Sequence, residues 1–137
     1  SSFGANFVKT MLRLGEDCNE LGIIFDQVGT PTYARDLARM ILNGIRDSKF
    51  DSKHWKVYHY SNEGVCSWYD FAKAIFELSK TSCKVNAIET KEYPTPAKRP
   101  YYSVLNKAKI KSELGVSVSY WKDSLKECLK TIEKDSK

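Results

Sequence analysis

Tyr69 and Lys73 are the first residues in this sequence whose types and spacing point to catalysis. They lie four positions apart in a segment with the apolar spacing of a helix, so both side chains share one helix face. A nearby ammonium group makes a phenol a stronger acid. Residues of this kind can act as a proton donor, and the pair therefore raises the question of oxidoreductase chemistry.

The surroundings of this pair argue against a catalytic role. The same spacing occurs in the catalytic pair of short-chain dehydrogenases, but no glycine-rich G-x-G-x-x-G loop occurs anywhere in the 137 residues. Tyr69 also falls in the first helical turn, directly after the expected cap. The sequence contains no G-x-S-x-G, H-E-x-x-H or P-loop motif either. We therefore predict that this chain contains no catalytic residue.

Binding chemistry is better represented, first in a polar turn between a strand and a helix. Asp26 and Gln27 follow the apolar run at residues 23–25. That places them at the carboxyl end of a predicted strand, where open α/β sheets bind ligands. Thr30 and Thr32 add two hydroxyl groups. The alternative is a capped turn that only connects two elements.

A second binding candidate is Arg99, which precedes Pro100 and the tyrosines at 101 and 102. Proline favours an extended conformation for the residue before it. An arginine held in this way can offer its planar guanidinium to a phosphate with two parallel hydrogen bonds. The alternative is an ordinary surface loop.

Composition narrows the class of protein. The 137 residues suit one domain, and 42% hydrophobic with 28% charged residues is typical of a soluble globular protein. No apolar run approaches the roughly 20 residues that a membrane span requires, and no signal peptide is evident. Four cysteines without a C-x-x-C pair, beside only two histidines, give no support for zinc and predict reduced thiols in a cytoplasmic protein.

The charge is unevenly distributed, with 13 Lys/Arg against 7 Asp/Glu in residues 80–137 and 9 against 10 in residues 1–79. A basic half attracts anions such as a phosphate, a nucleotide or a nucleic acid. A lysine-rich, solvated helix surface explains most of this excess equally well. No nucleic-acid recognition motif is present, and we expect no nucleic-acid partner.

These candidates must be positioned by alternating helices and strands. We predict helices at residues 5–14, 34–45, 68–76, between 106 and 115 and from about 120 onward, and strands at 23–26, 55–61 and 84–90. The proline-rich residues 93–100 exclude regular structure. The alternation predicts the α/β class, with a small, partly parallel sheet and packed helices.

Local signals define several of these elements in more detail. Thr32 is the predicted N-cap of the second helix, and Ser67 with Asp70 nearly matches a capping box. Gly15 and Gly44 are predicted to close the first two helices. We expect the strand at 23–26 to be buried on both faces. The two tryptophans that head helical apolar stripes are predicted to lie in the core; they are Trp68 and Trp121.

Five segments together resemble one known family. In order they are NFVKTMLRLG, FDQVGTPTYARDLAR, YHYSNEGVCSWYDFAKAI, YPTPAKRPYYSVLNKAKIK and YWKDSL. Their order and spacing over residues 6–129 resemble the carboxyl-terminal half of the dTDP-4-dehydrorhamnose reductases, which are extended short-chain dehydrogenase/reductases. The resemblance implies a substrate-binding portion that lacks most of the Rossmann domain. A first residue other than Met agrees with a segment of a longer reductase.

The resemblance also implies chemistry and site residues. Members of this family reduce the 4-keto group of dTDP-6-deoxy-L-lyxo-4-hexulose with NADPH (or NADH), and the Rossmann half supplies the cofactor loop and the catalytic Tyr-x-x-x-Lys pair. We therefore expect this chain alone to be inactive and to bind no cofactor. The resemblance places dTDP-sugar contacts at Asn6, Phe7, Asp26, Gln27, Thr30 and Thr32, and Arg99 near the diphosphate.

Two other readings stay open at this point. Some relatives of this family keep the fold and serve as non-catalytic regulatory subunits, so an interaction module is the alternative to an enzyme half. An oligomer is also compatible with the sequence. The residues that decide between NADPH and NADH lie in the Rossmann half of the family.

Overall fold

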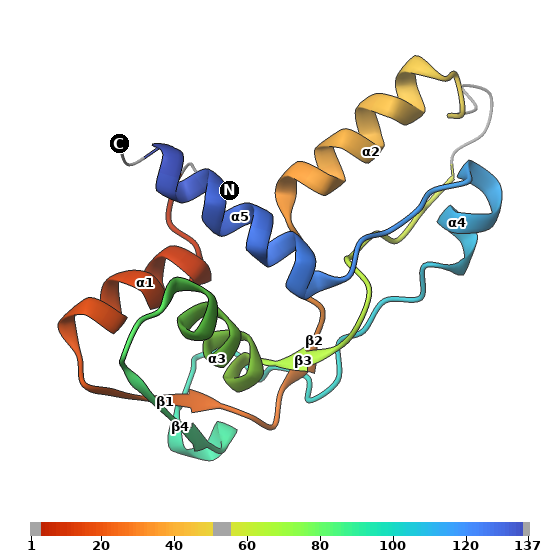
Figure 1. Ribbon diagram of the computed structural model, residues 1–137. Helices are drawn as coiled ribbons and strands as arrows, with labels where there is room; N and C mark the ends of the chain where they lie inside the picture. Colours follow the sequence, from red (N-terminus) through yellow and green to blue (C-terminus); the bar gives the residue numbers. More distant parts are fainter. Residues whose placement is uncertain (1–3, 51–55, 136–137) are drawn as a thin grey trace.

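The structure is a computed structural model that describes residues 4–50 and 56–135 of the chain (Figure 1). The helices of this part are α1 (Phe7–Asp17), α2 (Ala34–Arg46), α3 (Trp68–Ser79), α4 (Ala108–Leu114) and α5 (Trp121–Asp135). The strands are β1 (Glu20–Ile24), β2 (Val28–Gly29), β3 (Cys66–Ser67) and β4 (Lys84–Ile88), and a 3-10 helix, η1, spans Thr90–Glu92. The predicted α/β class is confirmed.

The strands form two small sheets in the described part of the chain. β1 pairs in parallel with β4, in a register that joins Glu20 to Lys84 and Ile24 to Ile88. β2 pairs antiparallel with β3, and an isolated parallel bridge joins Val28 to Tyr102. The predicted partly parallel arrangement is therefore present, although the two pairings are separate.

Helix α3 is the centre of the core. It packs against α1, α5 and both strands of the parallel pair, and Figure 1 shows α1 and α3 together while α2 extends away from them. The core side chains include Val8, Met11, Phe71, Ala72, Ile75, Phe76, Trp121, Leu125 and Leu129. These apolar side chains supply the main driving force for folding, because the hydrophobic effect scales with buried apolar area.

The start of α3 confirms the predicted capping box. The Ser67 hydroxyl oxygen accepts a hydrogen bond from the Asp70 backbone N–H at 3.0 Å, and the Asp70 carboxylate accepts one from the Ser67 N–H at 3.0 Å. Two otherwise unpaired amide groups are thereby satisfied. The predicted end of α4 at Gly115 is also confirmed, since this residue caps the helix with a φ of 62°.

Gly15 and Gly44, predicted to close the first two helices, instead lie inside α1 and α2. A Cβ atom at Gly15 would come within 2.7 Å of Thr81 and 2.8 Å of Phe76, so this glycine lets α1 approach α3 closely. A Cβ atom at Gly44 would come within 2.5 Å of the Phe50 ring. Each glycine therefore marks a close tertiary contact, which sequence alone does not distinguish from a helix end.

The beginning of α2 and the environment of β1 also differ from the predictions. The N-cap of α2 is Tyr33, whose side chain makes no capping bond, while the Thr32 hydroxyl donates to the Thr30 carbonyl at 3.5 Å. β1 is only partly buried, and Phe25 beyond its end is 45% exposed. In the described part of the chain this sheet has two strands, too few to enclose β1 on both faces.

The segment predicted as a strand at 55–61 is not a regular strand in the structure. Residues 56–62 carry no strand pairing there, and Trp55 lies outside the described residues. The apolar stripe of α2 is also uncovered: Ile41, Leu42 and Ile45 are 40%, 65% and 62% exposed.

The two tryptophans predicted for the core differ in their burial. Trp121 is 7% exposed and meets Phe71 edge-to-face, with 5.8 Å between ring centroids, so this prediction is confirmed. Trp68 is 38% exposed, and the prediction for it was wrong. It occupies the first turn of α3, where the helix surface leaves the core. No helix in the part of the chain described here has the length and apolar character needed to cross a membrane.

Replacement of these tryptophans by alanine should therefore have unequal effects. We expect Trp121→Ala to lower the free energy of unfolding by about 3–5 kcal/mol, the usual cost of removing a buried large side chain. Trp68→Ala should lower it by only about 1–2 kcal/mol, because part of its surface already meets solvent. Urea unfolding followed by circular dichroism measures both values. Equal losses would show that Trp68 belongs to the core after all.

Candidate functional site

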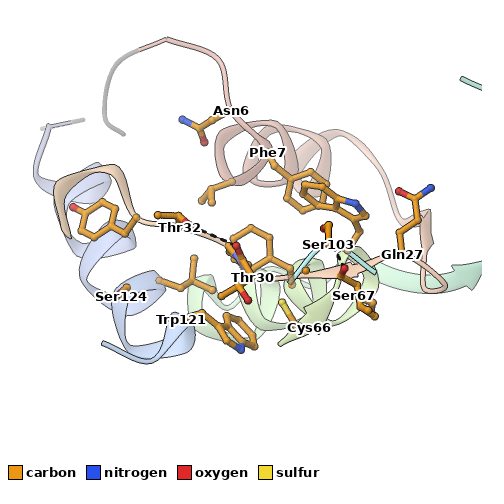
Figure 2. A pocket seen from close by; sticks show the side chains of 18 of the residues that line it. Asn6, Phe7, Gln27, Thr30, Thr32, Cys66, Ser67, Ser103, Trp121 and Ser124 are labelled. Atoms are coloured by element: carbon orange, nitrogen blue, oxygen red, sulfur yellow. Dashed lines mark hydrogen bonds between the residues drawn. The ribbon is translucent and has the colours of Figure 1, made fainter. Parts of the chain in front are cut away.

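A cleft of about 480 Å³ opens beside β2 and brings together six of the seven predicted binding residues. These six are Asn6, Phe7, Gln27, Thr30, Thr32 and Arg99. Figure 2 shows the labelled side chains of this group around the cleft, with those of Ser67, Ser103 and Ser124. The residues come from segments far apart in the sequence, so the cleft is a product of the tertiary fold.

Strand β2 positions the two binding loops relative to each other. The Val28 N–H donates to the Tyr101 carbonyl at 2.8 Å, and the Ser103 N–H donates to the Val28 carbonyl at 2.9 Å. The segment that follows Arg99 is thereby attached to the edge of β2 opposite β3. A Cβ atom at Gly29 would come within 2.8 Å of the Ser103 hydroxyl, so glycine permits this close approach.

Asp26, the seventh predicted residue, is not among the described residues that line the cleft. Its carboxylate accepts hydrogen bonds from the Thr90 hydroxyl at 2.6 Å and from the Thr90 N–H at 3.0 Å. The hydroxyl bond is the main cause that lowers the pKa of Asp26. Thr90 also accepts a hydrogen bond from the Gln27 amide at 3.0 Å. Asp26 therefore holds the neighbouring Gln27 in place.

Asn6 and Phe7 enter the cleft at the start of α1. The Asn6 side-chain oxygen accepts a hydrogen bond from the Lys9 N–H at 3.1 Å and so acts as the N-cap. The Phe7 ring stacks on Phe71 with 5.6 Å between centroids and 14° between planes. It also meets Trp68 at 4.8 Å. The rings of Phe7, Trp68 and Phe71 form an aromatic shelf at one end of the cleft, whereas Arg99 brings charge to the cleft from another segment.

The two threonines of the turn make internal hydrogen bonds. The Thr30 hydroxyl donates to the Gly64 carbonyl at 2.7 Å, which links the turn to residues 61–64. Among the described residues, the Thr32 hydroxyl makes the long contact to Thr30 given above and no other hydrogen bond. Thr30 therefore shapes the cleft, while Thr32 is the more available donor for a ligand.

Asn62 is fully buried and holds the turn against α2 and α5. Its side-chain oxygen accepts from the Tyr33 N–H at 2.8 Å, and its amide donates to Asp36 at 3.0 Å and to Ser124 at 2.8 Å. A buried polar side chain is tolerated when its hydrogen-bonding groups are satisfied. Asn62 meets this condition and joins three elements that surround the cleft.

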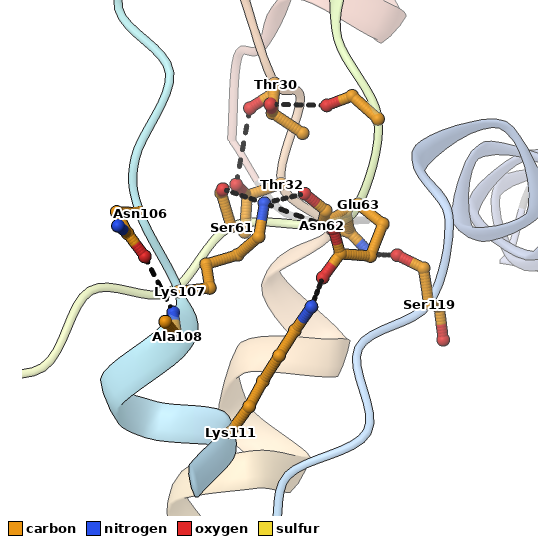
Figure 3. A network of polar contacts seen from close by, with 11 residues as sticks. Thr30, Thr32, Ser61, Asn62, Glu63, Asn106, Lys107, Ala108, Lys111 and Ser119 are labelled. Carbon is orange, nitrogen blue, oxygen red and sulfur yellow. Dashed lines mark hydrogen bonds and ion pairs between the residues drawn. The ribbon is translucent and has the colours of Figure 1, made fainter.

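Lys107 provides a second buried polar connection (Figure 3). Its ammonium donates to the Asn62 carbonyl at 3.0 Å and lies 3.6 Å from the Glu63 carboxylate. Glu63 also pairs with Lys111, and this contact is the main cause that lowers the pKa of Glu63. The Glu63 backbone pairs with Ser119 and Trp121 at the start of α5. These contacts hold Lys107 and Lys111, which follow the Arg99 loop in the sequence, against Asn62 and Glu63.

The remaining chemistry at the cleft is that of binding. Cys66 lines the cleft, but burial, with the nearby Asp70 carboxylate, raises the pKa of its thiol to about 12. The thiol therefore stays protonated near neutral pH and is a poor nucleophile. Tyr69 and Lys73 are not among the described residues that line this cleft. Among residues 4–50 and 56–135 no group of three His, Cys, Asp or Glu side chains is placed to bind a metal.

Sequence reasoning missed several cleft residues. Trp68 was assigned to the core because its spacing matches an apolar stripe, and Ser103 was not singled out although it lies four positions after Arg99. The pairing of residues 101–103 with β2 is what brings Ser103 to the cleft. The sequence indicated an extended, proline-rich loop with Arg99 as a binding candidate, but it gave no sign of this pairing with β2.

The fold and the cleft define a ligand-binding α/β module, and comparison with known proteins identifies its family. The RmlD substrate binding domain family matches residues 1–134, and the chain belongs to this family. The spore coat polysaccharide biosynthesis protein SpsK of Bacillus subtilis (strain 168) is 42% identical over 126 residues, which cover 92% of this chain and 42% of that protein. The dTDP-4-dehydrorhamnose reductase of Aggregatibacter actinomycetemcomitans is 41% identical over 132 residues, covering 90% and 45%.

Solved structures show the same relationship. A dTDP-4-dehydrorhamnose reductase from Clostridium acetobutylicum has a TM-score of 0.86 and 45% identity, covering 95% of this chain and 45% of that one. The reductase of Bacillus anthracis, solved in complex with NADP, has a TM-score of 0.81 and 36% identity, covering 91% and 42%. The resemblance seen in the sequence is confirmed, and the chain spans less than half the length of these relatives.

The Glu63 contacts predict a pH dependence of stability. The folded pKa of Glu63 lies below its ordinary value of 4.5, so its contribution is complete above that pH and is lost as the pH falls below it. The free energy of unfolding should fall as the pH is lowered from 5 to 3. In Glu63→Gln this fall should be smaller by up to about 1 kcal/mol, the size typical of partly exposed ion pairs. Urea unfolding at each pH gives these values. The exposed Glu133→Gln is the control, and matching pH profiles for the two variants would contradict this role.

Proposed function

We propose that this chain is the substrate-binding portion of an NADPH-dependent dTDP-4-dehydrorhamnose reductase and that its cleft holds the dTDP-sugar. The observation that carries the proposal is the convergence of six family-implied residues on one cleft, in a chain of the RmlD substrate binding domain family. The proposal treats residues 1–137 as a single domain. Its four free cysteines agree with a cytoplasmic location.

In this proposal Arg99 binds the diphosphate. Its guanidinium supplies a permanent positive charge and a planar set of donors that match phosphate oxygens. Gln27, Asn6 and Thr32 offer amide and hydroxyl groups to the sugar and to the rest of the nucleotide. Thr30 and Asp26 keep the turn in shape through Gly64 and Thr90.

The hydride donor belongs outside this chain. No glycine-rich dinucleotide loop occurs in the sequence, whereas the Bacillus anthracis relative, more than twice as long as its matched part, was solved with NADP. We propose that a Rossmann half of the same polypeptide holds NADPH (or NADH) and the catalytic pair. This chain then orients the 4-keto sugar toward that half and is inactive alone.

The uncovered face formed by α2 and residues 56–62 fits this partner. Three large aliphatic side chains are exposed on α2, and Val57 is 75% exposed. Exposure alternates along the neighbouring positions, with Tyr58 and Tyr60 half-buried and Val57 and His59 exposed, which is the pattern of a strand. An apolar face of this kind marks an interaction site. We propose that the Rossmann half covers it; nucleic acid and membrane have no part in this proposal.

The proposed role of Arg99 is tested in the full reductase polypeptide. Arg99→Ala should weaken dTDP binding by about tenfold to a hundredfold, because a hydrogen bond to a charged group contributes about 1.5–3 kcal/mol. Arg99→Lys should also weaken it, since an ammonium cannot form the two-pronged contact. Calorimetry at fixed salt measures both. NADPH affinity should stay unchanged, and unaltered dTDP affinity in Arg99→Ala would refute the assignment.

The proposal that the Rossmann half covers the exposed face of α2 is tested by introducing a charge there. Leu42→Asp should change the unfolding free energy of this chain alone by no more than about 0.5 kcal/mol, as is usual for exposed positions. In the full polypeptide the same change should destabilise by at least about 2 kcal/mol, because the charge would be buried without a partner. Leu125→Asp, in the core, is the control that should destabilise both. A small effect of Leu42→Asp in both proteins would show that the face stays open.

A further inference from the structure

Trp68 is the most exposed of the three rings in the aromatic shelf. Phe71 is 7% exposed and belongs to the core, and Phe7 stacks on it. Trp68 meets Phe7 at 4.8 Å but remains 38% exposed at the edge of the cleft. The shelf therefore has a buried base and a partly open outer ring.

Trp68 is also held in a defined position. It directly follows Ser67, whose capping box with Asp70 determines where α3 begins. Ser67 is in turn paired with Val28 of β2. The backbone that carries the indole is thus fixed by a helix cap and a sheet pairing at the same time. A ring positioned in this way can bind a flat partner with little further loss of conformational freedom.

The sheet pairings also fix the position of Trp68 relative to Arg99. β3 lies on one side of β2, and Tyr102 pairs with β2 on the other. Adjacent strands are about 4.8 Å apart, so the segments that carry Trp68 and Arg99 are separated by about 10 Å. β3 runs antiparallel to β2, so Trp68, which follows Ser67, lies toward the Gln27 end of β2. The bridge between Val28 and Tyr102 is parallel, so Arg99, which precedes Tyr102, lies toward the same end. Trp68 and Arg99 both line the cleft and reach it from opposite sides of β2, so a single ligand there can contact both.

We propose that Trp68, supported by Phe7, is the stacking platform for the pyrimidine base of the bound nucleotide. The proposal rests on the proposed function, in which Arg99 binds the diphosphate, and it assigns the opposite end of the ligand. Aromatic side chains stack on bases of any sequence, because every base has a π-face. Trp68 therefore supplies affinity, and thymine is not distinguished from uracil by this contact.

The test compares ligands with and without a base. Thymidine 5′-diphosphate, uridine 5′-diphosphate and inorganic pyrophosphate are titrated into this chain, with ligand-observed NMR to reach millimolar dissociation constants. We expect Trp68→Ala to weaken both nucleotides by about tenfold to a hundredfold, the range found for loss of base stacking. Trp68→Phe should weaken them less, and pyrophosphate binding should not change. The exposed Tyr93, outside the cleft, provides the control Tyr93→Ala.

Each other outcome has a definite meaning. If Trp68→Ala binds the nucleotides as tightly as the unaltered chain, the platform is refuted while the proposed function stands. Parallel loss of pyrophosphate binding would refute it too, because the change would act on the whole cleft. If the unaltered chain binds no nucleotide, the proposed function fails first and the platform with it. If Trp68→Ala does not fold, the nucleotide affinities of Trp68→Leu and Trp68→Phe are compared instead. Trp68→Phe should bind more tightly, because it keeps an aromatic face.

Discussion

The cleft depends on one constraint: a strand of two residues, β2, is paired on both of its sides. Val28 pairs with Ser67 on one side and exchanges hydrogen bonds with Tyr101 and Ser103 on the other. These few bonds bring the start of α3 and the Arg99 loop to the same edge. Without them the aromatic shelf and the guanidinium would belong to separate parts of the surface. Gly29 leaves room for the Ser103 side chain, because a Cβ atom at this position would come within 2.8 Å of the Ser103 hydroxyl.

The polar groups beneath this strand explain why so short a pairing can persist. Asn62 and Lys107 are buried, and each bonds to residues of other segments. A buried donor or acceptor that loses its partner costs about 1–3 kcal/mol, so any movement of the turn that breaks these bonds is opposed. The side of the molecule that carries α2 is different, since its apolar residues meet solvent. The structure therefore combines a cleft held by buried hydrogen bonds with a helix, α2, whose apolar side chains are exposed.

Sequence signals were most successful where the cause is local. The capping box of α3, the C-cap at Gly115 and the irregular, proline-rich loop each depend on neighbouring residues, and each was predicted. The failures have distant causes. Gly15 touches Phe76, and Asp26 is drawn to Thr90. The turn at residues 26–32 and Arg99 were binding candidates from residue type and position, and the family resemblance added Asn6 and Phe7. Trp68 needed the structure, because its spacing alone matches a core position.

Amide chemical-shift mapping of this chain with thymidine 5′-diphosphate would show whether the nucleotide binds in the cleft beside β2. We expect the largest shifts at Gly29, Ser103 and the first turns of α1 and α3, and little change at the exposed residues of α2. A second hollow of about 300 Å³ lies between α2 and residues 114–119. Shifts centred on Asn43 and Val116 in that hollow, with the β2 cleft unaffected, would show that the nucleotide binds elsewhere on the chain.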